Sequence, residues 1–88
     1  MGSVDSKEFA LLLAHFLGNA KAPLSAPAAA GLSGFGVGAA LSVLRLLERE
    51  GILRSTRRGG RRFFRADAGS MSYRRCRLAH AAQARLLN

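Results

Sequence analysis

The sequence predicts a mainly α-helical fold with a small β-hairpin (α+β), in which three helices are followed by the hairpin and by a C-terminal helix. Two observations lead to this prediction. Apolar side chains recur at helical spacing in the first part of the chain, and a Gly-Gly pair at residues 59–60 separates two short strand-like runs. With 88 residues, of which 49% are hydrophobic, the chain can form one domain with a packed core, near the lower size limit for independent folding.

The first helix is predicted over residues 6–17. Its apolar side chains recur at i, i+3, i+4, i+7 and i+8, the stripe of an amphipathic helix. They are Phe9, Leu12, Leu13, Phe16 and Leu17. Asp5 and Glu8 have the spacing of a capping box at the start of this helix, and Gly18-Asn19 is a typical stop.

A connector and a short second helix follow. Pro23 interrupts helical structure, and Leu24 is expected to reach the core. Ser25 is the predicted N-cap of an alanine-rich helix over residues 26–32. Four glycines within residues 31–38 then predict a tight turn.

The third helix is predicted over residues 36–50 and carries apolar residues on two flanks. One flank is Val37, Ala40, Leu41, Leu44 and Leu47, and the other is Ala39, Val43 and Leu46. A narrow polar row remains, made of Gly38, Ser42, Arg45 and Arg49. We expect this helix to be buried on two sides, against its own core and against a partner protein. Arg45 and Arg49 either contact a polyanion or pair with Glu48 or Glu50.

The hairpin is predicted from strands 52–57 and 61–66, turned through Arg58-Gly59-Gly60. Gly51 ends the third helix at a position that needs a left-handed residue, and Ile52 and Leu53 are expected to pin the first strand to the core. Phe63 and Phe64 point to opposite faces of the sheet, so one is expected to pack inward and the other to be more exposed. The hairpin carries six arginines, Arg54, Arg57, Arg58, Arg61, Arg62 and Arg65.

A last helix is predicted over residues 71–87, capped by Ser70 or Ser72. Cys76 and His80 lie four residues apart and supply half of a metal site, but the ligand count is too short. We therefore interpret them as a buried cysteine and a partly buried histidine, and expect no metal and no cofactor. As the only cysteine, Cys76 also excludes an intrachain disulfide and makes a cytosolic setting the default.

Charge is distributed very unevenly along the chain. Residues 1–50 balance four basic side chains with four acidic ones, whereas residues 51–88 contain ten arginines and a single acid, Asp67. The entire net charge of +9 therefore lies in the second part of the chain. A neutral helical part joined to a cationic part is typical of a scaffold that presents an electropositive surface to a polyanion.

The order of elements resembles a winged helix-turn-helix, and residues 44–66 are similar to the ArsR/MarR-type bacterial transcriptional regulators. In that family the recognition helix steps into a β-hairpin, the wing, as Gly51-Ile52-Leu53 does here. The wing has a basic, glycine-containing tip, here residues 57–62, and returns through Phe63-Phe64-Arg65. The resemblance implies a winged helix-turn-helix domain over residues 5–67, and makes the C-terminal helix, residues 70–88, a candidate dimerisation element.

The resemblance also implies a function. The chain is expected to be a non-enzymatic, DNA-binding transcriptional regulator that binds double-stranded DNA as a homodimer in the bacterial cytoplasm, associated with the nucleoid. The side chains expected at DNA are Ser42, Arg45, Arg49, Arg54, Arg57, Arg58, Arg61, Arg62 and Arg65. Residues 36–42 offer almost no side-chain donors or acceptors for reading base edges. We therefore expect the wing to be the main anchor.

Two other functions fit the same pattern. The chain is alternatively an adaptor module that docks a protein through the apolar third helix and the basic wing, or it binds RNA through the same arginines. An enzyme is disfavoured, because the sequence has no paired carboxylates, no nucleophile–base arrangement and no phosphate-binding Gly-Lys loop. A membrane protein is disfavoured too, because no apolar run reaches the roughly 18–20 residues of a transmembrane helix.

Overall fold

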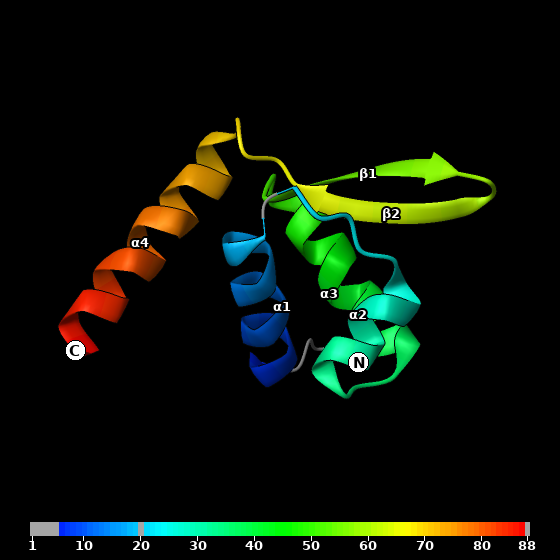
Figure 1. Ribbon diagram of the computed structural model, residues 1–88, viewed down its shortest axis with the longest axis horizontal. Coiled ribbons are helices and arrows are strands. Elements are labelled where there is room, and N and C mark those ends of the chain that lie inside the picture. Colours follow the sequence, from blue (N-terminus) through cyan, green and yellow to red (C-terminus); the bar gives the residue numbers. More distant parts are fainter. Residues whose placement is uncertain (1–5, 20, 88) are drawn as a thin grey trace.

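The computed structural model describes residues 6–19 and 21–87, and within them it contains four helices and one two-stranded antiparallel sheet (Figure 1). The elements are α1 (Ser6–Gly18), α2 (Ala26–Ser33), α3 (Val37–Arg49), β1 (Leu53–Arg58), β2 (Arg61–Ala66) and α4 (Met71–Leu87). The predicted α+β class is confirmed, and no predicted element boundary differs from the observed one by more than one residue. Asp5, the predicted cap of the first helix, lies outside the described residues.

The core lies between the first three helices and the base of the hairpin. Phe16 of α1, Leu44 of α3 and Phe64 of β2 are each 0% exposed. Around them lie the other buried apolar side chains, which are Leu12, Ala29, Ala40, Val43, Leu47, Ile52, Leu53, Ala66 and Tyr73. Figure 1 shows the hairpin projecting past the helices at one end of the molecule and α4 at the other end, diverging from α1 toward the C-terminus.

The hairpin turn is shorter than predicted. β1 continues through Arg58, which pairs with Arg61, so only Gly59 and Gly60 form the turn. Their φ angles of 55° and 78° are both left-handed, as a two-residue turn between twisted strands requires. The prediction that Arg58 belongs to the turn is therefore wrong, because two consecutive glycines complete the turn without a third residue.

The connector before α2 lies along the free edge of β2. The Leu24 backbone N–H donates to the Phe64 carbonyl at 2.7 Å, and the Phe64 N–H donates to the Leu24 carbonyl at 2.9 Å. Phe64 is fully buried while Phe63 is half-buried, which confirms the prediction that the two rings lie on opposite faces. The connector therefore ties the hairpin to the helices through the backbone.

Helices α2 and α3 are joined by a tight turn at residues 34–36 and lie at 107° to each other. Ser25 caps α2 as predicted, because its Oγ accepts from the Ala28 N–H at 3.3 Å. Gly34, with a φ of 77°, ends α2 in the left-handed conformation that favours glycine. Among the described residues, no helix alone has the length and apolar character to cross a membrane, and the only pair that meets both criteria together is α2 with α3, bent at the turn.

A hydrogen-bonded corner joins α3, the hairpin and α4. Gly51 has a φ of 82°, as predicted for the residue that ends α3. Of the two predicted caps of α4, Ser70 is the one used. Its Oγ accepts from the Tyr73 N–H at 3.0 Å and donates to the Gly51 carbonyl at 2.6 Å. The start of α4 is therefore fixed to the end of α3.

Beyond its first turns, α4 makes few contacts with the rest of the fold. Tyr73 is 1% exposed and Cys76 is half-buried against the core, whereas His80 is exposed. The prediction of a partly buried histidine is therefore wrong. Figure 1 shows the reason, since α4 stands away from α1 along most of its length.

Replacing Ser70 by alanine is expected to lower the free energy of unfolding by about 1–2 kcal/mol, because it removes the cap of α4 and the bond to Gly51 together. Urea denaturation followed by circular dichroism measures the change. The matched control is Ser72→Ala, two residues along, for which we expect a change within about 0.5 kcal/mol. Equal effects of the two substitutions would contradict the assigned cap.

Candidate nucleic-acid interface

The polar row predicted on α3 is exposed along its whole length. Gly38, Ser42, Arg45 and Arg49 are all exposed. The opposite face of the helix is buried through Ala40, Val43, Leu44 and Leu47. Across the short turn, α2 packs against α3. The row therefore lies on a helix whose other face is held by the fold.

The structure corrects the placement of two valines on the apolar flanks predicted for α3. Val43, placed on that side by the sequence, is 0% exposed and lies in the chain's own core. Val37, placed on the core stripe, is 49% exposed, because it begins α3 at the end remote from the hairpin (Figure 1). Of the second flank predicted for α3, Ala39 is exposed and Leu46 is half-buried.

The carboxylate of Glu48 holds the hairpin to α3. Its Oε2 accepts from Ser55 Oγ at 2.6 Å, and both side chains are half-buried. Within the described part of the chain, the hydrogen-bond partner of this carboxylate is thus a serine of β1 and not Arg45 or Arg49. The bond fixes the orientation of β1 relative to the exposed row of α3.

All six hairpin arginines are exposed, and the strand register sets them opposite one another. The cross-strand pairs are Arg54 with Arg65, Arg57 with Arg62, and Arg58 with Arg61. Residues directly opposite in an antiparallel sheet have Cβ atoms about 4.5–5.5 Å apart and project from the same face. Like charges in these positions repel each other, so the hairpin carries three pairs of opposed like charges.

The register also divides the arginines between two faces of the hairpin, which sequence reasoning missed. Arg57 and Arg62 share the face of the buried Phe64, which we call the inner face. The outer face carries the pairs Arg54–Arg65, Thr56–Phe63 and Arg58–Arg61. The Gly-Gly pair could have predicted this division, because a two-residue turn fixes the register of the strands and the register decides which face each side chain occupies.

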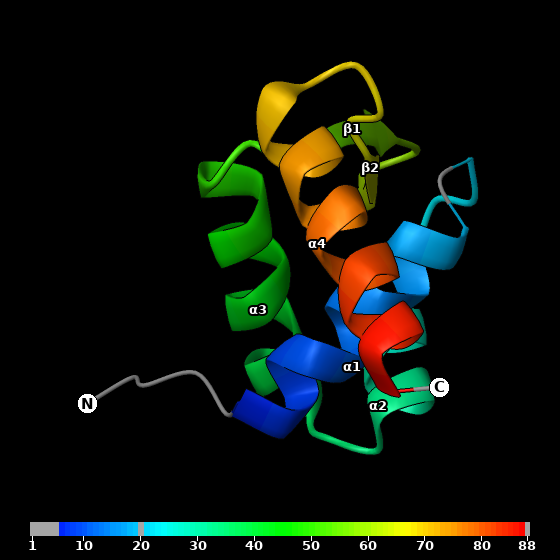
Figure 2. The same cartoon turned by 90° about the vertical axis from the view of Figure 1, so that its left-hand side faces the viewer.

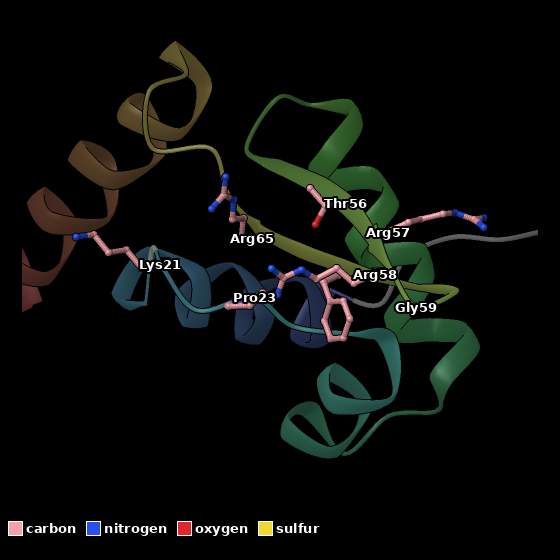
Figure 3. Close-up of a pocket in the computed structure, with 8 residues that line it drawn as sticks. Lys21, Pro23, Thr56, Arg57, Arg58, Gly59 and Arg65 are labelled. Atoms are coloured by element: carbon pink, nitrogen blue, oxygen red, sulfur yellow. The ribbon is translucent and has the colours of Figure 1, made fainter.

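An open depression of about 750 Å³ lies against the outer face of the hairpin. Its lining joins the connector to both strands and comprises Lys21, Pro23, Thr56, Arg57, Arg58, Gly59, Phe63 and Arg65 (Figure 3). Four of these eight residues are cationic and none is acidic. Figure 3 shows the Arg58 side chain on the same side as Pro23, whereas Arg57 is directed away toward α3.

A second cationic surface lies on α4. Arg74, Arg75 and Arg77 are exposed and border a depression of about 660 Å³. Met71 and Leu78 lie in the same depression and are 63% and 72% exposed. An apolar strip flanked by arginines is therefore open on this helix.

Within residues 6–19 and 21–87, no three His, Cys, Asp or Glu side chains come together as a metal site would require. The chain matches no protein-family model, no curated protein and no solved structure. Function is therefore inferred from the residues and their geometry alone.

Proposed function

We propose that the chain is a winged-helix transcriptional regulator that binds double-stranded DNA in the bacterial cytoplasm. The angle of 107° between α2 and α3 falls in the range of about 90–120° found for helix-turn-helix motifs. Their three-residue turn contains Gly34 and Gly36, and such turns often contain glycine. The hairpin that follows α3 is then the wing, and α3 is the recognition helix.

The observation that carries the proposal is the set of three cross-strand arginine pairs. Each pair costs the isolated fold stability, since like charges directly opposite in a sheet are destabilising. Nucleic-acid phosphates placed between the guanidinium groups turn that repulsion into attraction. A hairpin built only for folding gains nothing from this arrangement, whereas a hairpin that binds a polyanion does.

On duplex DNA, the row on α3 and the inner face of the wing act together. Arg45 and Arg49 are exposed on α3, and Arg57 is directed toward the side on which α3 lies (Figure 3). The Ser42 hydroxyl donates to the Gly38 carbonyl of its own helix at 3.1 Å. Few side chains remain to read bases, so most of the affinity comes from phosphate contacts and depends little on sequence.

The proposed assembly is a homodimer formed through α4, as the exposed Met71 and Leu78 favour. Closing this strip between two copies removes apolar surface from water. It also places two wings on one duplex, which doubles the number of phosphates in reach.

The salt dependence of binding tests the proposal. If the dimer neutralises about six phosphates, a plot of log K against log salt concentration should have a slope of about −5. Fluorescence anisotropy with a labelled random-sequence duplex measures K, and light scattering in the same buffers gives the mass of the complex. Affinity that barely changes between low and moderate salt would contradict phosphate binding.

A further inference from the structure

We infer that the outer face of the wing is a second nucleic-acid site, which takes unpaired nucleotides with one base stacked on Phe63. This proposal does not depend on duplex binding. It rests on the side chains that the register places on the outer face and on the depression that the connector closes on one side.

The outer face surrounds one aromatic ring with four guanidinium groups. Phe63 lies in the middle of β2 and pairs with Thr56 of β1. The pair Arg58–Arg61 lies two residues toward the tip and the pair Arg54–Arg65 two residues toward the base. Two residues along a strand span about 7 Å, so cationic groups flank the ring on both sides.

The depression extends beyond Phe63 toward the base of the wing. A second hollow, of about 240 Å³, continues from the first and shares Lys21 and Arg65 with it. It adds Arg54 and the segment Ala66–Gly69, in which Asp67 is the only acid. The two hollows together form a cationic track that runs from the tip of the hairpin to its base.

The track suits unpaired nucleotides better than either a duplex or an acidic peptide. A base can stack on Phe63 only if its flat face is free, and a duplex hides the faces of its bases. An acidic peptide supplies charge but no flat group for the ring. Single-stranded nucleic acid supplies phosphates to the arginines and a base to Phe63 at once.

The track is separate from the proposed duplex surface. Figure 2 shows α3 on one side of the hairpin and the 21–24 connector on the other. Arg57 and Arg62 belong to the inner face, whereas Arg54 and Arg65 belong to the outer face. The two sites can therefore be removed one at a time.

Tryptophan fluorescence provides a direct test, because the chain contains no tryptophan. In the Phe63→Trp variant, the introduced indole lies at the stacking position. Oligonucleotides of about eight nucleotides, within the usual site sizes, should quench its emission on binding. The probes are oligo(dT), oligo(U) and an abasic oligomer that has the same phosphates but no bases. The ratio of the affinities for oligo(dT) and oligo(U) shows whether the site prefers a DNA strand or an RNA strand.

Substitutions at Phe63 separate stacking from charge. Phe63→Leu should weaken oligo(dT) binding by about tenfold, whereas Phe63→Tyr should leave it nearly unchanged. The abasic oligomer should bind the wild type about tenfold more weakly than oligo(dT) does, and should bind Phe63→Leu with the same affinity as the wild type. Thermal unfolding of each variant confirms that the fold is retained.

Two matched double substitutions separate the two sites, since each removes two arginines from one site only. Arg54→Gln/Arg65→Gln should lower oligo(dT) affinity by about tenfold or more and reduce the salt slope by about 1.4. Arg45→Gln/Arg49→Gln, on the exposed row of α3 and outside both hollows, should leave oligo(dT) affinity within about twofold and weaken duplex binding instead. This reciprocal pattern keeps failure of the single-strand site distinct from failure of the duplex proposal.

Three results would overturn the inference. The first is unquenched indole emission from a Phe63→Trp variant that still binds oligo(dT) or oligo(U). The second is equal affinity of the wild type for the abasic oligomer and for oligo(dT). The third is an affinity of the wild type for poly-glutamate as high as its affinity for oligo(dT). Each would show that the outer face binds charge without stacking a base.

Discussion

Replacing Arg57 and Arg62, the arginine pair on the inner face, by glutamine is expected to weaken duplex binding by about a hundredfold at roughly 0.1 M salt. Each phosphate contact contributes about 0.9 to the salt slope, which at this salt concentration corresponds to about a tenfold change in affinity. Glutamine keeps part of the aliphatic chain and a polar end group, and it removes the charge and most of the N–H donors. Anisotropy titrations with the random duplex measure both the loss and the smaller slope.

The matched control for this variant neutralises Arg74 and Arg75 on α4, which lowers the net charge by the same amount. Because these arginines lie outside the wing and the row on α3, we expect less than a tenfold loss for a protein of equal charge. The wing variant should also unfold at an unchanged or higher temperature, since it relieves repulsion between strands. Equal losses of affinity in the two variants would mean that net charge, and not the wing, holds the DNA.

Replacing Phe64 by alanine is expected to lower the free energy of unfolding by about 3–5 kcal/mol. Phe64 is 0% exposed and joins the hairpin to the core, so its removal leaves a cavity at the point where strand, connector and helices meet. Small domains are stable by only about 5–15 kcal/mol, and the melting temperature should fall by about 15–30 °C.

The neighbouring residue provides the control for this prediction. Phe63 is the same residue type on the same strand, but it is half-buried on the outer face. Phe63→Ala should lower the free energy of unfolding by about 1 kcal/mol. Comparable destabilisation by the two substitutions, measured by thermal denaturation, would contradict the assignment of inner and outer faces.

The elements themselves were predictable because their signals are local. Gly59-Gly60 predicts a hairpin turn, Ser25 predicts a cap, and Gly51 predicts the end of a helix from residue type alone. The exposed row of α3 was predictable as well, since helical periodicity places Ser42, Arg45 and Arg49 on one face.

The parts that could not be predicted depend on contacts distant in sequence. The two hydrogen bonds between Leu24 and Phe64 join backbone atoms, so the residue types at these positions do not predict them. The exposure of Val37 depends on the position of the first turn of α3 within the fold, and the exposure of His80 depends on the separation between α4 and α1. Neither position in space is encoded in a local sequence pattern. Predicting which residues line the outer face requires the strand register and the position of the connector. The track with Phe63 at its centre could therefore be recognised only in the structure.

The corner at residues 51–52 determines how the wing meets a ligand. The Ile52 N–H donates to the Leu47 carbonyl, the Asp67 N–H donates to the Ile52 carbonyl, and Ser70 donates to Gly51. Both ends of the wing and the start of α4 are thereby fixed to the end of α3, and the bond from Ser55 to Glu48 adds a fourth constraint. Under the proposed function, a nucleic acid would meet a hairpin already oriented during folding, and little conformational entropy would be lost at that joint on binding. The proposed complex would then require changes in the shape of the nucleic acid and not in the orientation of the hairpin.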